Sequence, residues 1–453
     1  MRKKMVILGA GSSMFTQGLI MDVMQNPGNH KWHLALVDVD EQIALAMFRL
    51  AKKMVAAKAA DLELSMSTDR RDVLPGADYV VSTIGVGGRR AWEQDVFIPR
   101  KYGVYQPVGD TMMPGGISRA MRMVPAMVDV VRDIEGLCPK ARFFNYSNPM
   151  AIICRAIAKG TGFPMTGLCI GVPHSQWYIS DFAGLEREKV SSLSVGINHM
   201  TFMYDFRYEG SPAWDRVRAK LDKEFREDFD PTALDRFHGD AQSEIFYLGE
   251  PYAWTFFRKY GAYPAPGDRH ITEFFTELFP GGNYYGRKLG IDAYSFEGTI
   301  SMGDRIHENA MRVAMSDEPL DDSFFSKSSG EHEQLMEIIN SIEGDDRKIY
   351  SVNLPNRGAV SNLPYESVIE MPAVASATGF HPLQIRDFPD HLAGIVTRHL
   401  SIVELAAEAA LRGDRALFVE SILLGGYLPD RKIVEAMVDE LISVQREYLP
   451  QFK

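Results

Sequence analysis

The sequence predicts an α/β protein with a Rossmann-like, doubly wound parallel sheet in its N-terminal part and an intimately packed α+β C-terminal domain. Short apolar runs rich in branched residues occur at 5–8, 33–37, 79–84, 142–146 and 166–170. Helical patterns lie between several of them, at 41–60, 117–135 and 149–159. Such alternation is typical of βαβ units and a parallel sheet. Beyond about residue 200, long helical stretches at 214–229 and 389–412 are mixed with aromatic loops, which indicates a second domain.

The length and composition of the chain are those of an ordinary globular protein with two domains. At 453 residues the chain is too long for one small core, so we expect domains at 1–198 and 199–453. Apolar residues make up 45% of the chain and charged residues 24%, which are ordinary values. A net charge of −11 without a long basic run argues against nucleic acid or an anionic membrane as the main partner.

Cysteine usage and the N-terminal residues indicate a reducing compartment, which we expect to be the cytoplasm. The three cysteines are too few for a disulfide framework. The apolar run after Lys4 is too short for a signal peptide and leads directly into Gly9. No stretch approaches the roughly 20 apolar residues that cross a bilayer.

The first turn carries a nucleotide-binding pattern, although its usual third glycine is absent. Gly9 and Gly11 let the backbone approach a pyrophosphate, and Ser12 and Ser13 follow at the start of a helix whose N-terminus favours phosphate. Asp38 ends the second strand, where an acid accepts from ribose hydroxyls and disfavours a 2′-phosphate. The pattern therefore predicts NAD, and the alternative is a tight turn with a structural aspartate.

Residues that follow the other strands are expected in the same crevice, because ligands of parallel sheets lie at the carboxyl ends of the strands. Gly85 and Gly87 would let backbone approach the nicotinamide ribose, unless they form only a flexible turn. We assign Asn145 to the cofactor and Asn148 to the substrate. Asn148 also stands before a proline at a helix start, so helix capping is an alternative role.

Two residues later in the chain suit a metal ion. Cys169 and His199 would supply a thiolate and an imidazole, which are good ligands for a borderline divalent metal. The alternatives are a small buried cysteine and a structural histidine. We assign Asn198, which precedes His199, to the substrate.

The run Gly267-Asp268-Arg269-His270 follows a Gly- and Pro-rich stretch, a composition typical of a site loop. Asp268 would be a base or a neighbour of the metal, Arg269 would hold a substrate anion, and His270 would contact the substrate. The alternative is a polar turn with an internal Asp–Arg pair. The polar loop at 353–356 would line the pocket or form a structural turn.

These segments together resemble glycoside hydrolase family 4, the NAD-dependent glycosidases, from Gly9 to about Glu370. The matching stretches are 9–13, 86–88, 105–111, 114–116, 145–149, 196–199, 267–270 and 353–356. The detail is nearer to the α-galacturonidase and α-glucosidase branches than to the phospho-sugar branches. The resemblance implies NAD and a divalent ion, usually Mn2+, as cofactors, a sugar as substrate, and a homodimer or homotetramer.

The reaction that the resemblance implies is a redox-assisted elimination rather than the two-carboxylate hydrolysis of most glycosidases. NAD takes a hydride from sugar C3, the ketone acidifies the C2 proton, and a base removes that proton as the C1–O bond breaks. Water adds at C1 and NADH returns the hydride, while the metal polarises the C2 and C3 oxygens. Carried over, Cys169 and His199 bind the metal, Asn148 contacts the substrate, and Tyr260 or Asp268 is the base.

One departure from the family pattern follows Cys169, where Ile170 replaces the usual polar residue. Isoleucine neither donates a proton nor binds metal. Either His174 takes that role, or the leaving group needs no acid, or the metal site is altered. The chain would then belong to a divergent branch, such as the family-4-like NAD-dependent sulfoquinovosidases. Arginines suited to a sugar carboxylate or sulfonate are Arg89, Arg90 and Arg269.

We therefore expect an NAD-dependent glycosidase that cleaves a hexose glycoside, with an anionic sugar as one option. One alternative is an NAD-dependent 2-hydroxy-acid dehydrogenase, which would accumulate NADH. Another is an NAD-binding protein with a decayed site, for which Ile170 is the only support. The sequence leaves the sugar, its anomer and the aglycone open.

Overall fold

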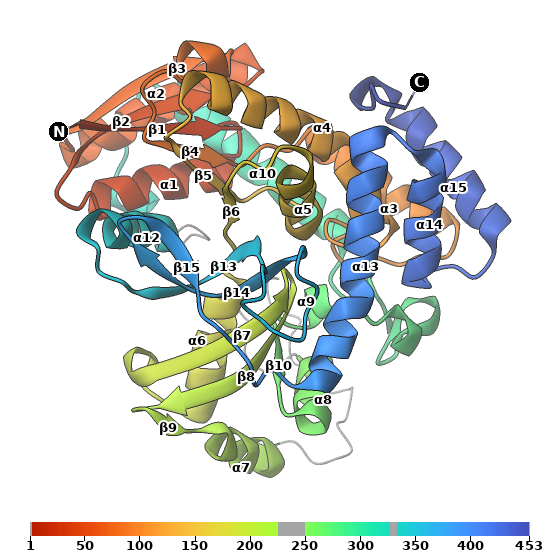
Figure 1. Ribbon diagram of the computed structural model, residues 1–453. Coiled ribbons are helices and arrows are strands. Elements are labelled where there is room, and N and C mark those ends of the chain that lie inside the picture. Colours follow the sequence, from red (N-terminus) through yellow and green to blue (C-terminus); the bar gives the residue numbers. More distant parts are fainter. Residues whose placement is uncertain (1, 225–249, 327–332, 453) are drawn as a thin grey trace.

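The computed structural model describes residues 2–224, 250–326 and 333–452, and within them one large sheet carries helices on both faces (Figure 1). The sheet has 13 strands in the order β10-β8-β7-β14-β13-β6-β5-β4-β1-β2-β3, with β15 beside β14 and β9 beside β8. A separate two-stranded sheet is formed by β11 (Asn283–Tyr284) and β12 (Arg287–Lys288). The predicted α/β class is confirmed.

The N-terminal half of the sheet is parallel and doubly wound. Its strands are β1 (Arg2–Leu8), β2 (Lys31–Val37), β3 (Leu62–Ser67), β4 (Tyr79–Ser82), β5 (Arg142–Asn145) and β6 (Met165–Gly167). The chain builds outward from β1 to β3 and then returns to add β4 on the other side of β1. Ligands of such sheets bind beyond the carboxyl ends of the strands near this switch point.

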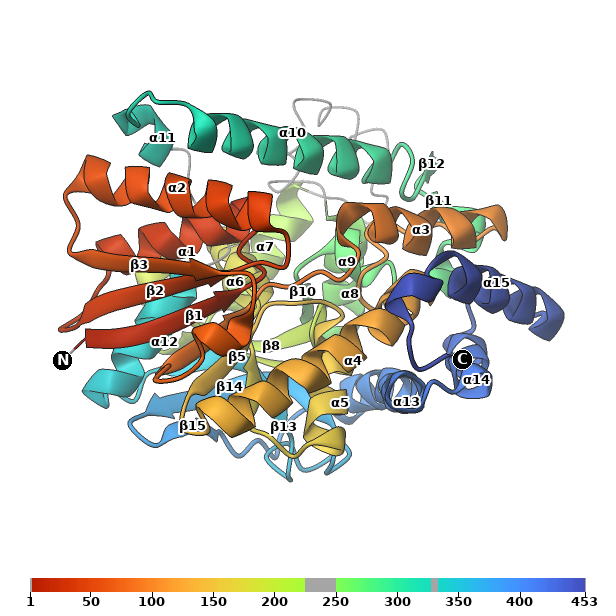
Figure 2. The same cartoon turned by 90° about the horizontal axis from the view of Figure 1, so that it is seen from above.

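Helices bury both faces of the parallel half. One face is covered by α1 (Ser13–Gln25), α2 (Glu41–Lys58), α10 (Phe296–Met315) and α12 (Glu333–Gly344), and Figure 2 shows α2 and α10 side by side. The other face is covered by α4 (Pro114–Leu137), α5 (Met150–Gly160) and α13 (Asp390–Arg412). In β1, Met5 and Ile7 pack on the first face and Val6 and Leu8 on the second, as alternation along a strand requires.

The second half of the sheet is antiparallel and continues the first without a break. Its strands are β7 (Val190–Ile197), β8 (Met200–Tyr208), β9 (Ser211–Pro212), β10 (Tyr263–Ala265), β13 (Ile349–Pro355), β14 (Val368–Ser376) and β15 (Gly379–Pro382). The two halves join where Asn353 of β13 pairs with Gly167 of β6. The predicted division after residue 198 would fall in the β7–β8 turn, and it stays a prediction.

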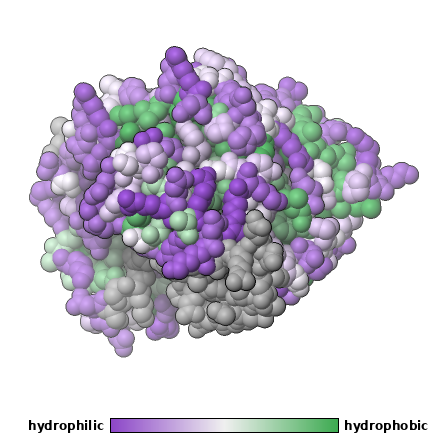
Figure 3. Space-filling view, turned by 90° about the horizontal axis from the view of Figure 1, so that it is seen from below, coloured by the Kyte–Doolittle hydropathy of each residue, from purple (hydrophilic) through white to green (hydrophobic). Residues whose placement is uncertain are grey.

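The remaining helices are α3 (Gly88–Lys101), α6 (Gly171–Ala183), α7 (Trp214–Glu224), α8 (Pro251–Tyr260), α9 (Asp268–Ile271), α11 (Asp322–Ser326), α14 (Arg415–Gly425) and α15 (Arg431–Val444). Of these helices, α6, α7 and α8 pack against one face of the antiparallel half, where they share a core cluster with β7, β8 and β10 (Figure 1). The helix predicted over 214–229 is seen to residue 224, and 225–229 lie outside the described residues. The face in Figure 3 is mainly hydrophilic, with separate apolar patches. No described helix is long and apolar enough to span a membrane.

Candidate active site

The first turn and the end of the second strand meet as the nucleotide pattern requires. Gly9 has φ +81°, and a Cβ atom there would lie 2.8 Å from the backbone of Ile84, so only glycine fits without strain. The Gly11 amide donates to Asp38 Oδ2 at 2.7 Å. Ser12 precedes α1, and the side chain of Ser13 lies outside the described residues. The amides of Gly9 and Ala10 donate to the Val37 carbonyl oxygen, both at 2.9 Å, so the turn is held against the end of β2.

The second glycine loop begins α3 and lies against the C-terminal segment. Gly87 has φ +75°, and a Cβ atom there would lie 2.9 Å from the Tyr448 ring, whereas Gly85 is exposed. Arg89 and Arg90 both pair with Asp304 of α10, at 2.6 Å and 2.7 Å. These two arginines therefore already have a carboxylate partner in the protein.

A buried ion pair is hydrogen-bonded to the backbone of this loop. Arg122 and Asp95 have side-chain exposures of 1% and 0% and form two hydrogen bonds of 2.8 and 2.6 Å. Arg122 Nε donates to the carbonyl oxygen of Val86 at 2.8 Å, and Gln445 bonds to both charged partners. The loop is thereby tied to the end of α15, which is far away in the sequence.

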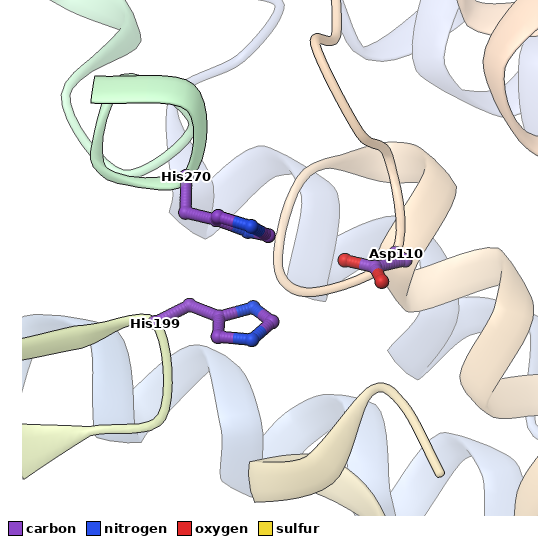
Figure 4. A group of neighbouring side chains, drawn as sticks. All are labelled: Asp110, His199 and His270. Atoms are coloured by element: carbon purple, nitrogen blue, oxygen red, sulfur yellow. The ribbon is translucent and has the colours of Figure 1, made fainter. Parts of the chain in front are cut away.

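Three side chains from separate parts of the chain form a candidate metal site, shown in Figure 4. Asp110 precedes α4, His199 lies in the β7–β8 turn with φ +69°, and His270 belongs to α9. One ligand atom from each lies within 4.8 Å of the other two. A carboxylate with two imidazoles is a donor set that suits a divalent transition metal.

A hydrogen-bonded chain determines which nitrogen of His199 faces the ligand. The Thr111 hydroxyl lies 2.8 Å from Asp110 Oδ1 and 2.7 Å from His199 Nδ1. A carboxylate only accepts, so the hydroxyl proton goes to Asp110, and Nδ1–H of His199 donates to the hydroxyl oxygen. His199 Nε2 then keeps its lone pair, as a metal-binding imidazole needs.

Both histidines are suited to bind metal as neutral rings. Burial lowers the pKa of His199, and burial together with the nearby His199 and Arg269 lowers the pKa of His270 well below its usual value. His270 Nδ1 is buried and has no hydrogen-bond partner. An unsatisfied buried nitrogen is costly, and a bound metal or a substrate hydroxyl would satisfy it.

Asn148, predicted to contact the substrate, is hydrogen-bonded to the candidate metal site. Its Nδ2 donates to Asp110 Oδ2 at 3.0 Å, while its Oδ1 is buried without a partner. This free acceptor is available to a sugar hydroxyl. Asn145 instead exchanges two hydrogen bonds of 3.0 Å with the backbone of Ser147, so its side chain shapes the turn.

Glu273 holds the loop that carries Asp110. It is fully buried, and its Oε1 accepts from the amides of Val108 and Gly109 at 2.8 and 2.7 Å. Burial raises the pKa of Glu273 to about 8. Glu273 follows α9, so this contact fixes the segment before Asp110 against α9, although the two segments are far apart in sequence.

The two predicted bases lie at opposite ends of α8. Asp268 is fully buried and accepts from the amides of Tyr252 and Ala253 and from the Tyr284 hydroxyl, at 2.8, 2.7 and 2.6 Å. Burial raises its pKa to about 6. Tyr260 ends the helix, about 12 Å along its axis from Tyr252. It is 42% exposed and packs on His391.

Three other predicted site residues are not part of the three-residue cluster. Cys169 is partly exposed, and its Sγ accepts from the Gly171 amide at 3.4 Å. His174 is exposed and contacts the Trp177 ring. Asn198 is buried and donates to Glu370 at 3.2 Å.

Arg269 differs from Arg89 because it has no ion pair with any described residue. Its Nη2 donates to the Thr299 hydroxyl at 3.0 Å, and its Nε is buried without a partner. The predicted internal pair between Asp268 and Arg269 is absent from the described contacts. The guanidinium therefore remains available for an anion.

No role was predicted from the sequence for Asp110, Thr111 or Glu273. Asp110 and Thr111 lie in the 105–111 stretch that carried the family resemblance, so a signal was present. Glu273 had no local signal, because its contact to Val108 spans 165 residues.

Comparison with known proteins assigns the chain to a family. The sequence model of the family described as "Family 4 glycosyl hydrolase" matches residues 4–181, and the model of that family's C-terminal domain matches residues 194–425. An α-galacturonidase of Thermoanaerobacterium saccharolyticum is 30% identical over 84% of the chain and 82% of the relative. An α-glucosidase of Erwinia rhapontici is 28% identical, with 100% of both chains covered.

The fold is also similar to that of solved structures. A 6-phospho-α-glucosidase from gut microorganisms, crystallised with NAD and Mn2+, superposes with a TM-score of 0.85 at 18% identity, covering 100% of both chains. The resemblance carried by the motifs is confirmed. The chain belongs to family 4 of the glycosyl hydrolases and is a glycoside hydrolase.

Proposed function

We propose that the protein is an NAD-dependent, divalent-metal-assisted glycosidase that acts on a hexose glycoside with an anionic group. The observation that carries this proposal is the Asp110–His199–His270 cluster, whose Asp110 is hydrogen-bonded to Asn148 in the segment after β5. The unpaired guanidinium of Arg269, next to His270, supports an anionic sugar such as a glycuronide or sulfosugar. The NAD and Mn2+ in the related crystal structure support both cofactors.

The residues present fit both cofactors. Gly9, Gly11 and Asp38 would hold NAD, with Gly85 and Gly87 near its nicotinamide end. Asp110, His199 and His270 would hold the metal, and Cys169 stays a predicted further ligand. When bound, the pair would supply hydride transfer at sugar C3 and polarisation of the C2 and C3 oxygens.

The protein's own side chains would position the sugar and move its protons. Asn148 Oδ1 would accept from a sugar hydroxyl, and Thr111 would keep His199 in the tautomer that leaves Nε2 open. Of the two predicted C2 bases we favour Asp268 on its position, because it lies two residues before His270 in α9, whereas Tyr260 ends α8 and packs on His391.

The proposal is tested by hydrolysis of aryl hexosides and hexuronides with and without NAD and Mn2+. We expect release of the aryl group only when both are present, solvent deuterium at product C2, and no net NADH. Full activity after complete removal of NAD would exclude the mechanism. Net NADH formation from a small hydroxy acid would favour the dehydrogenase alternative instead.

The choice of base is tested by Asp268→Asn and Tyr260→Phe. We expect deuterium exchange at C2 to be lost with Asp268→Asn and kept with Tyr260→Phe. The reverse result would assign the base to Tyr260.

A further inference from the structure

Arg119 of α4 has a position that connects the two halves of the candidate site. Its Nε donates to the carbonyl oxygen of Asn148 at 3.0 Å, in the segment after β5. A Cβ atom placed on Gly85, in the loop after β4, would lie 3.7 Å from Arg119 Nη2. Strands β4 and β5 are neighbours in the sheet. The guanidinium therefore lies at the carboxyl ends of two adjacent strands, where α/β sheets bind ligands.

Arg119 has no ion pair with any residue that the structure describes. Arg122, one turn later in the same helix, is bound on two sides by Asp95. Arg119 by contrast has one hydrogen bond, to a neutral carbonyl. Burial and the nearby Arg122 lower its pKa, and the more distant carboxylates of Asp110 and Asp95 oppose this shift. A partly buried cation that no carboxylate contacts directly is costly for the fold. The guanidinium thus keeps the capacity to bind an anion directly.

The guanidinium is also held in one orientation. It lies over the Trp92 ring, 5.6 Å from the ring centroid, and such cation–π contacts restrain the plane of the group. Its terminal nitrogens have no protein partner and are not among the fully buried atoms, so solvent reaches them. They are free to form the paired hydrogen bonds that arginine makes with a carboxylate or sulfonate.

The position favours the substrate over the cofactor as the source of the anion. The cofactor's pyrophosphate is expected at Gly9 and Gly11, at the start of α1. Arg119 instead contacts Asn148, whose side chain bonds to Asp110 of the candidate metal site.

We propose that Arg119 binds the carboxylate or sulfonate of the sugar and makes the enzyme selective for anionic glycosides. This inference rests on the proposed glycosidase function and adds the residue that would determine its specificity.

The kinetic test compares an aryl hexuronide with the matching neutral hexoside. With Arg119→Met, we expect kcat/KM for the hexuronide to fall by about 10- to 100-fold, the effect of losing a charged hydrogen bond. The neutral hexoside should change less than about threefold, and Arg119→Lys should restore part of the loss. Arg132→Met is the matched control, because Arg132 lies on the same helix, is 69% exposed and pairs only with Asp129. Equal losses on both substrates, or weaker NAD binding as the main effect, would overturn the proposal.

A binding test keeps the inference separate from catalysis. Because Arg119 covers Trp92, a hexuronate added to the NAD-loaded protein should change Trp92 fluorescence, and the neutral hexose should not. Trp92→Phe identifies the signal, and Arg119→Met should abolish it. If no glycoside is hydrolysed but the hexuronate signal is present, the proposed function fails while Arg119 keeps its assignment. If glycosides are hydrolysed and the uronate signal is identical in Arg119→Met, the assignment of Arg119 is wrong.

Discussion

Replacing Thr111 by valine tests whether the metal site depends on the hydrogen-bonded chain behind it. The hydroxyl of Thr111 links Asp110 Oδ1 and His199 Nδ1, at 2.8 and 2.7 Å, and all three residues are buried. Valine has nearly the same shape but neither donates nor accepts. His199 would lose the contact that selects its tautomer, and the Asp110 carboxylate would lose one donor.

The size of the effect follows from these two contacts. A buried polar group left without its partner costs about 1–3 kcal/mol. Removing the outer hydrogen-bond partner of a metal ligand typically weakens metal binding by about 10–100-fold, which corresponds to about 1.4–2.8 kcal/mol. The two routes agree, so we expect the Kd for Mn2+ to rise by about one to two orders of magnitude in Thr111→Val.

The assay is a Mn2+ titration followed by electron paramagnetic resonance of the free ion at constant pH. Thr111→Ser is the matched control, because it keeps the hydroxyl and should bind Mn2+ nearly as well as the natural protein. A folded Thr111→Val protein with unchanged Mn2+ affinity would refute the role of the Thr111 hydrogen bonds in metal binding. Absence of Mn2+ binding by the natural protein would refute the metal site itself.

Three further predictions concern residues other than Asp110, Thr111 and His199. Glu273→Ala leaves two buried amides without an acceptor, so it should weaken Mn2+ binding at least about fivefold and lower stability by about 1–3 kcal/mol. The control Glu273→Gln keeps an acceptor oxygen and should change neither value. The Mn2+ titration and thermal melts measure the two effects. Arg122→Met leaves its buried acid partner uncompensated and should cost about 3–5 kcal/mol of unfolding free energy in denaturant; a loss below about 1 kcal/mol would contradict the role of this pair. Burial raises the pKa of Cys138 to about 11 and that of Cys154 to about 12, so at pH 8 iodoacetamide should label Cys169 first, as read by mass spectrometry. Protection of Cys169 by Mn2+ would support it as a ligand, and unchanged labelling would count against it.

The local features of the nucleotide pattern were predictable from the sequence. The apolar run at 5–8 is the end of β1, and Gly9 and Asp38 are both held within one short βαβ unit. The hydrogen bond between Gly11 and Asp38 spans only 27 residues. The strand, the glycine turn and the acid all lie in segments that are close in sequence. The local sequence pattern is therefore enough to predict how they are arranged.

Interactions between distant segments were not predictable in the same way. Arg89 was expected to be available for a substrate anion, but Asp304, 215 residues later, already pairs with it. Asn356, proposed for a pocket or a turn, bonds only to nearby backbone atoms and shapes a turn. Nothing in the residues around either position indicates which partner the fold supplies.

The sequence by itself determined the α/β class, the nucleotide turn and the family, because these depend on periodicity and on short motifs with fixed spacing. Only the tertiary structure decided which polar groups meet. It brought Asp110, His199 and His270 together from three segments, and it left Arg119 and Arg269 without ion pairs in the part of the chain that is described. The physical reason is that a side chain's charge and hydrogen bonds are satisfied by whatever packs against it, and that packing is set by the whole sheet and its helices.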